Sequence, residues 1–116
     1  MKVVRVYTGD DGESHFEDMD IPLIHEGDIG RLSEKIVSTG IIFRETGADY
    51  DYTWHNAPCR QFIVNLEGGV EIEVGDGTKR YFGPGDVILV EDTEGRGHMS
   101  RSIDNKPRKS IFVTLE

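Results

Sequence analysis

The chain has 116 residues, of which 36% are hydrophobic, and its formal net charge is −9. This length suits one domain with a single core, and the acidic surface would repel phosphate backbones and anionic lipids, so nucleic-acid and membrane roles are disfavoured. No window approaches the roughly 18 apolar residues of a membrane span. Neither the N-terminal segment nor the single cysteine, Cys59, indicates secretion, so we expect a cytoplasmic protein.

The first part of the chain, residues 1–36, is expected to form N-terminal strands and an irregular arm. Alternation of apolar and polar residues predicts a strand at Lys2–Thr8 and a weaker strand at Ser14–Ile21, with a glycine-containing turn between them. The segment Leu23–Ser33 is mostly polar and contains two glycines, so we expect it to be irregular.

The remainder, residues 37–115, carries a dense series of strand and turn signals and is expected to form the core of the domain. The predicted strands are Lys35–Glu45, Tyr50–His55, Gln61–Leu66, Val70–Val74, Lys79–Phe82, Asp86–Val90, His98–Ile103 and Ser110–Leu115. No ten-residue window has the apolar stripe of a helix. The sequence therefore predicts an all-β barrel or sandwich in a single domain, residues 1–116.

Alternation also predicts which side chains share a face of each strand. In the strand Tyr50–His55, the side chain of His55 would point away from Tyr50, Tyr52 and Trp54. These three aromatic residues could form a wall for a ligand, but we expect them to pack under a strand or a subunit. If His55, Gln61 and His98 all point inward, one end of the barrel interior is polar. The predicted pocket consists of His55, Gln61, Ile63, Asn65, His98 and Ser100.

The first half of this region resembles the first motif of the cupin superfamily, in which two histidines are followed by a glutamate and a glycine. His55 matches the first histidine and Gly68 matches the closing glycine. Ala57 stands at the position of the second histidine, and Gln61 stands at that of the glutamate.

The second half resembles the second cupin motif, with its opening glycine, its histidine and its final asparagine. Gly85 matches the glycine, His98 matches the histidine after a longer loop, and Ser102 replaces the asparagine. The resemblance covers residues 37–115. It implies a cupin-type double-stranded β-helix, or jelly-roll barrel, of the small RmlC-like kind, with a degenerate metal motif.

The resemblance also raises the question of a metal. Cupins that bind Fe, Mn, Ni or Zn usually do so through three histidines and one carboxylate, whereas this chain keeps two histidines and a neutral glutamine. One weakly held divalent transition metal on His55, Gln61 and His98 is therefore one alternative. The other is a metal-free pocket in which both histidines are hydrogen-bonded.

Two classes of function follow. The first is a small cupin that binds a polar or carboxylate-bearing small molecule in the barrel, with or without the metal. The alternative is a metal-dependent enzyme of the isomerase, lyase or dioxygenase type that acts on a small carboxylate or enol, with His98 or His55 as the base.

We also expect a homodimer. Small cupins commonly dimerise by packing or exchanging edge strands. The strand Lys2–Thr8 is apolar on both faces and, if it lay at an open edge, would need to be covered by a partner chain.

The other candidate residues are expected to be structural. We expect His15 and His25 at the surface and an inert thiol at Cys59. The turn Gly95-Arg96-Gly97 would deliver His98 to the barrel, with an anion cradle as the alternative.

Overall fold

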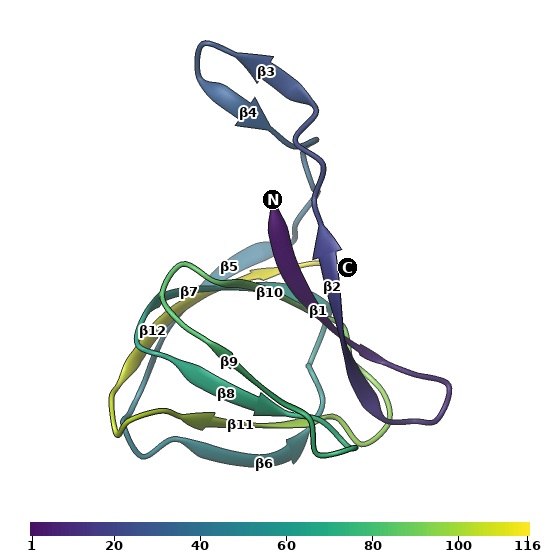
Figure 1. Cartoon of the computed structure of the whole chain (residues 1–116), viewed down its shortest axis with the longest axis vertical. Coiled ribbons are helices and arrows are strands. Elements are labelled where there is room, and N and C mark those ends of the chain that lie inside the picture. The colour runs from purple at the N-terminus through teal and green to yellow at the C-terminus, as the bar shows by residue number, and fades with distance from the viewer.

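The structure, a computed structural model, describes residues 1–116 and contains twelve strands and no helix. Ten strands form two sheets that enclose the interior of a barrel (Figure 1). The larger sheet has the order β2 (Ser14–Asp20), β1 (Lys2–Thr8), β10 (Val87–Val90), β7 (Gln61–Glu67), β12 (Arg108–Thr114) and β5 (Gly40–Thr46). The smaller sheet has the order β6 (Asp51–His55), β11 (His98–Ser102), β8 (Val70–Glu73) and β9 (Lys79–Phe82). The predicted all-β fold is confirmed.

The strand order is that of a jelly roll, because most neighbours in the sheets are far apart in sequence. β12 lies between β7 and β5, and β11 lies between β6 and β8. The two sheets share one core, to which Val6 and Ile88 of the larger sheet and Val70 and Ile72 of the smaller sheet contribute. Val6 and Ile88 have no exposed surface at all.

The N-terminal strand β1 is an interior strand of the larger sheet. It pairs antiparallel with β2 on one side and parallel with β10 on the other. The expectation that Lys2–Thr8 could be an open edge was therefore wrong. β2 is the edge strand on this side of the sheet, and its three acidic residues suit exposure and discourage pairing with another chain, whereas β5 is the edge strand on the opposite side.

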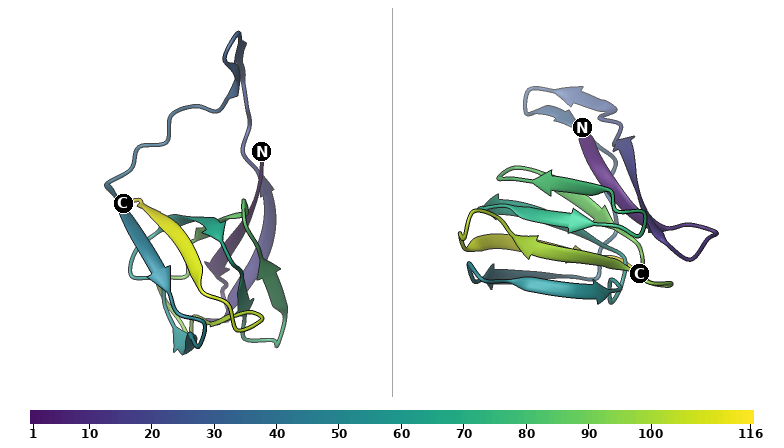
Figure 2. Two further views of the ribbon diagram at one scale, coloured as in Figure 1. Left: turned by 90° about the vertical axis from the view of Figure 1, so that its left-hand side faces the viewer. Right: turned by 60° about the horizontal axis from the view of Figure 1, so that its bottom comes forward.

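The segment between β2 and β5 leaves the barrel and returns to it. Within it, β3 (His25–Gly27) and β4 (Gly30–Leu32) form a two-stranded hairpin that projects from the barrel (Figures 1 and 2). We expected an irregular segment here. A hairpin forms because Gly30, with φ of 107°, allows a tight turn between the short strands β3 and β4. All six residues of its two strands are exposed.

The structure contains no helical segment with the length and hydrophobicity of a membrane span.

Candidate functional site

The two histidines of the predicted pocket meet because their strands are neighbours. His55 ends β6 and His98 begins β11, and the two residues are directly opposite each other in the antiparallel pairing. Their ring centroids lie 4.4 Å apart. Two residues that are 43 positions apart in sequence thus form one end of a cavity.

This cavity has a volume of about 310 Å³ and lies between the larger and the smaller sheet of the barrel. From the larger sheet it is lined by Arg44, Gln61, Ile63, Ile88, Val90, Arg108 and Phe112, and from the smaller sheet by Tyr52, His55, Val70, Ile72, His98 and Ser100. Tyr50 and the residues Asn56, Ala57 and Pro58, which lie outside the strands, complete it. No aspartate or glutamate lines it. Five of the six residues predicted for the pocket are present, and Asn65 is the exception.

Asn65 lies at the far end of β7 from the histidines and serves the fold instead. Its side chain is 1% exposed, and its Nδ2 donates to the carbonyl oxygen of Gly68 over 2.7 Å. This bond fastens the turn between β7 and β8. It gives the buried amide nitrogen a partner, whereas Oδ1 of the same side chain has none.

The expectation for the aromatic residues Tyr50, Tyr52 and Trp54 was wrong for two of the three. Between the pairs His98–His55 and Ser100–Tyr52, β6 advances by three residues while β11 advances by two, which is a β-bulge. The bulge turns both Tyr52 and His55 into the cavity, where their rings stack with centroids 3.9 Å apart. Tyr50 also lines the cavity, and its hydroxyl is 2.6 Å from Ser100 Oγ. Trp54 lies under the guanidinium of Arg96 instead.

Each histidine is held through its Nδ1 atom. His55 Nδ1 is 2.6 Å from the carbonyl oxygen of Thr53, which can only accept, so this nitrogen carries the proton and Nε2 of the neutral ring has a free lone pair. His98 Nδ1 is 2.6 Å from Asp92 Oδ2. The Asp92 carboxylate fixes the His98 ring in the same tautomer.

Asp92 and Ser14 were not predicted as site residues. Asp92 has no exposed surface, and the Ser14 hydroxyl donates to its Oδ2 over 2.6 Å. The other carboxylate oxygen, Oδ1, has no partner. Ser14, Asp92 and His98 therefore form a buried chain of hydrogen bonds that ends at the cavity.

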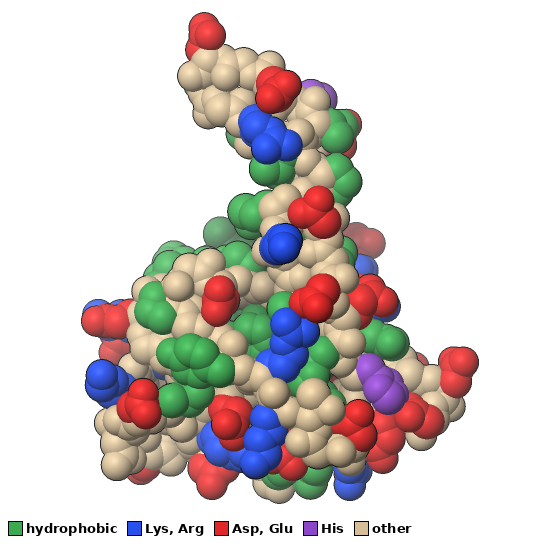
Figure 3. All heavy atoms as spheres, in the orientation of Figure 1, with side chains coloured by type: hydrophobic (Ala, Val, Ile, Leu, Met, Phe, Trp, Pro, Cys, Tyr) green, Lys and Arg blue, Asp and Glu red, His purple; other side chains and the backbone are tan.

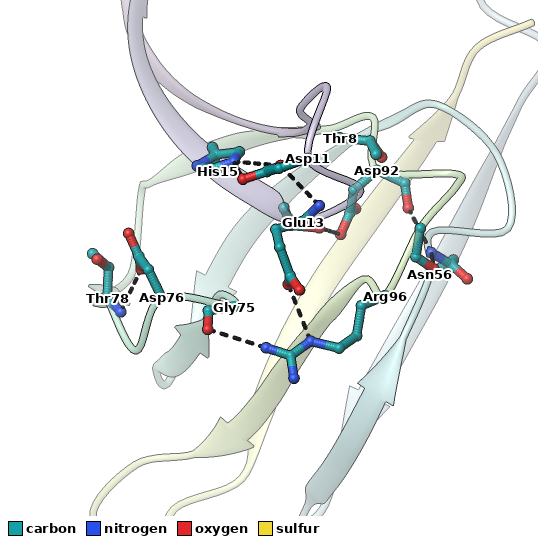
Figure 4. Close-up of polar contacts among 12 residues, drawn as sticks. Thr8, Asp11, Glu13, His15, Asn56, Gly75, Asp76, Thr78, Asp92 and Arg96 are labelled. Atoms are coloured by element: carbon teal, nitrogen blue, oxygen red, sulfur yellow. Dashed lines mark hydrogen bonds and ion pairs between the residues drawn. The ribbon is translucent and has the colours of Figure 1, made fainter.

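The hairpin formed by β1 and β2 makes hydrogen bonds to the loop that carries Asp92 (Figure 4). Thr8 Oγ1 donates to the carbonyl oxygen of Glu94, and the backbone N–H of Arg96 donates to that of Gly12, both over 3.0 Å. The Arg96 guanidinium pairs with Glu13 at 3.0 Å. The N–H of Arg96 is therefore used within the chain, and the turn at residues 95–97 leads directly to His98 at the start of β11.

The remaining sequence candidates lie outside the cavity. His15 pairs with Asp11 at 3.0 Å and His25 with Glu34 at 3.3 Å. Cys59 is partly buried and does not line the cavity.

The side chains of the cavity fit a resident metal poorly. No third histidine, cysteine, aspartate or glutamate lies with His55 and His98 in a group that could hold an ion. Gln61 offers only a neutral amide oxygen, and two arginines share the cavity, so a divalent cation would meet positive charge without a carboxylate to offset it.

Removal of metal should therefore have no effect on this protein. We expect dialysis against a chelator to leave the unfolding temperature unchanged, because two imidazoles and one amide form a weak site. The measurement is thermal unfolding before and after dialysis, with elemental analysis of both samples. Stoichiometric metal that survives dialysis in the wild type and is lost from His98→Ala would contradict this view.

Burial lowers the pKa of His55 below its ordinary value, and the nearby His98 lowers it further, while the bond to Thr53 acts in the opposite direction. In the unfolded chain His55 takes up a proton near pH 6.5. The folded protein resists that proton, so the unfolded state binds more protons as the pH falls through this value. Folding stability should then rise with pH across this range and fall on acidification.

Urea unfolding between about pH 5 and 8 tests this pH dependence around the ordinary histidine pKa. Acidification should reduce the free energy of unfolding less in the variant His55→Gln than in the wild type. The matched control is His25→Gln, which removes an exposed histidine and should show the same decrease in stability at low pH as the wild type. An identical dependence of the free energy of unfolding on pH in wild type and His55→Gln would contradict a lowered pKa of His55 in the folded protein.

Comparisons with known proteins give the fold. No family model and no curated protein matches the chain. Among solved structures, it is similar to a cupin 2 conserved barrel domain protein from Salinispora arenicola, with a TM-score of 0.53 and 16% identity over 66% of this chain and 61% of that one. It is also similar to a protein from Neisseria meningitidis, with a TM-score of 0.52 and 21% identity over 70% of this chain and 79% of that one. The match spans less than two thirds of the Salinispora chain. These similarities show that the chain has the cupin barrel fold, as its motifs predicted.

Proposed function

We propose that this cupin barrel binds one small polar or carboxylate-bearing molecule in the cavity between its sheets. The observation that carries the proposal is the cavity itself, in which nine of seventeen lining residues are hydrophobic and the polar groups converge at the two histidines. With about 30 Å³ per water-sized group, its volume of about 310 Å³ suits a ligand of roughly ten non-hydrogen atoms.

The bound molecule would contact both kinds of lining. Its apolar part would lie against Ile63, Ile72 and the Tyr52 ring. A polar group of the ligand would face His55 and His98, whose Nε2 atoms are free to accept a hydrogen bond.

Protein-observed NMR tests this proposal with 4-hydroxybenzoate, a molecule of the expected size and polarity, as the probe. We expect the imidazole signals of His55 and His98 to shift on titration, while those of the exposed His25 stay in place. Shifts confined to the β3–β4 hairpin or to the outer faces of the sheets would contradict binding inside the barrel.

An enzyme is the second candidate, and the pairing of His98 with buried Asp92 favours it. Asp92 would orient the His98 ring and stabilise the imidazolium that forms when Nε2 takes a proton. Nε2 could remove a proton beside a carbonyl group of a small acid and return it at another position, which is an isomerisation that needs no metal. Deuterium exchange into a series of 2-oxo acids in D₂O tests this role. Exchange that is equally fast with wild type and His98→Gln would rule it out.

We further propose that a second copy of the chain covers the outer face of the larger sheet. Phe43 and Ile41 of β5 are 78% and 60% exposed there. An apolar hollow beside them is lined by Met1, Ile21, Ile36, Phe62, Val64, Val87, Val113 and Leu115. Hydrophobic side chains also lie along the stalk that joins the β3–β4 hairpin to the barrel (Figure 3). A monomer rarely leaves so much contiguous apolar surface in water.

Light scattering at micromolar concentration should therefore give twice the chain mass of 13.0 kDa. The variant Phe43→Glu should shift the mass toward the monomer, because it places a charge on the exposed apolar surface of β5. Tyr81→Glu is the control, since Tyr81 is 58% exposed on β9 of the other sheet. A wild-type protein that scatters as a 13.0 kDa monomer would contradict the dimer.

A further inference from the structure

Two arginines of this protein lack a carboxylate partner, and both line the cavity. The chain has eight arginines. Six form ion pairs with carboxylates, namely Arg5, Arg31, Arg60, Arg80, Arg96 and Arg101. The other two are Arg44 and Arg108. In a chain with 22 acidic residues, a shortage of carboxylates cannot explain this.

Arg108 is the more unusual of the two because it is buried. The residue is only 4% exposed, and its Nε atom has no hydrogen-bond partner. Removing a charged group from water is costly unless a counter-charge or hydrogen bonds replace the water. No acidic side chain lines the cavity to do so.

Arg44 lies on the neighbouring strand and is only weakly engaged. Its Nε donates to Ser110 Oγ over a long distance of 3.3 Å, and its guanidinium lies 4.5 Å from the centre of the Phe112 ring. Burial lowers the pKa of Arg44, while Tyr50 acts in the opposite direction.

The strand register places these two arginines close together. Arg44 on β5 is opposite Ser110 on β12, and Arg108 on β12 is opposite Thr46 on β5. The arginines are therefore diagonal neighbours on the inward face, a spacing of about 7–8 Å that long side chains can bridge. The hydroxyl of Thr46, opposite Arg108, is also buried without a partner.

We propose that Arg108 and Arg44 form a carboxylate-binding subsite in the part of the cavity built by β5 and β12. The proposal rests on the binding function proposed above and narrows its ligand to a small organic acid. A carboxylate matches the planar fork of a guanidinium and supplies the missing negative charge. Because the histidines come from the opposite sheet, the acid would span the barrel, with an apolar middle and a second polar group at its far end.

A matched pair of probes tests the proposal. 4-Hydroxybenzoate has a carboxylate, an apolar ring and a hydroxyl at the far end, whereas 4-hydroxybenzamide has nearly the same shape without the charge. Calorimetric titration of the full-length protein should show the acid binding about 10- to 100-fold more tightly than the amide, as expected for hydrogen bonds between charged groups. The variant Arg108→Gln should abolish this preference, and Arg44→Gln should reduce it. The control Arg31→Gln, which removes an exposed arginine of the β3–β4 hairpin, should keep it.

A second measurement distinguishes a binding role of Arg108 from a structural one. If the charge is uncompensated until a ligand binds, Arg108→Met should raise the unfolding temperature of the ligand-free protein. It should also remove the stabilisation that 4-hydroxybenzoate gives to the wild type. A lower unfolding temperature for ligand-free Arg108→Met would show that the side chain supports the fold and would overturn the proposal.

The relative affinities for the acid, the amide and inorganic phosphate separate the carboxylate subsite from the binding function. Equal affinity for the acid and the amide would overturn the carboxylate subsite while leaving a binding function in place. Tighter binding of inorganic phosphate than of 4-hydroxybenzoate would assign the arginines to a phosphate group instead. Failure of both aromatic probes to bind at millimolar concentration would contradict the proposed ligand class and the binding function together.

Discussion

Replacement of Asp92 by alanine should lower the free energy of unfolding by about 2–6 kcal/mol. The carboxylate is fully buried, and its Oδ2 accepts hydrogen bonds from Ser14 Oγ and His98 Nδ1, each at 2.6 Å. The variant leaves both donors buried without a partner, and each such loss costs about 1–3 kcal/mol. Urea unfolding measures the effect.

The control for this variant is Asp76→Ala. Asp76 Oδ1 also accepts a hydrogen bond, from the backbone N–H of Thr78 over 2.8 Å, but it lies in an exposed turn. Its removal should cost about 1 kcal/mol or less, as is usual for a surface change. Similar losses for the two variants would mean that the buried chain of hydrogen bonds does not support the fold.

Replacement of Gly97 by alanine should have an effect of similar size, by a different route. Gly97 has φ of 79°, and a Cβ atom there would lie only 2.0 Å from the carbonyl oxygen of His55. The residue must therefore lack a side chain for β11 to approach β6 at the two histidines. The backbone conformation costs about 1–2 kcal/mol for alanine, and overpacking adds typically 1–3 kcal/mol.

Gly77 supplies a matched control, because its φ of 87° is nearly the same and a Cβ atom there would meet nothing within 4 Å. Gly77→Ala should lose only the backbone contribution. The two variants are compared by urea unfolding and by the imidazole NMR signals of His55 and His98. Equal stabilities, with unchanged histidine signals in Gly97→Ala, would show that the close approach at Gly97 is not needed.

Much of the fold could be predicted from local patterns. The strand Lys2–Thr8 has the same bounds in the structure, and the predicted strand Gln61–Leu66 differs from β7 by one residue. Alternation within β7 and β11 correctly brought Gln61, Ile63, His98 and Ser100 to one cavity. The predictions of face succeeded because β7 and β11 direct alternate side chains to the interior.

Prediction was wrong where the period breaks or where pairing is decided at long range. The bulge in β6 shifts Tyr52 to the same side as His55, and nothing in the sequence of that strand marks it. The interior position of β1 depends on β10, more than 80 residues away in the chain. Long-range pairing of this kind follows from the whole topology and not from the strand's own residues.

The charged residues of the site were missed for two reasons. The last strand was predicted to begin at Ser110, whereas β12 begins at Arg108, so the inward position of that arginine two residues earlier went unnoticed. Extending the alternation backward from Phe112 through Ser110 would have placed Arg108 on the same face. Asp92 gave no such signal, because it lies in a loop and its partner Ser14 is 78 positions away.

A crystal structure of the protein grown with 4-hydroxybenzoate tests most directly whether this barrel is a binding site for a small acid. We expect the molecule between the two sheets, with its carboxylate at hydrogen-bonding distance, about 2.7–3.2 Å, from the Arg108 guanidinium. Its hydroxyl should face the Nε2 atoms of His55 and His98. A molecule bound only on the outer surface, or a carboxylate turned away from both cavity arginines, would contradict a binding site for a small acid inside the barrel.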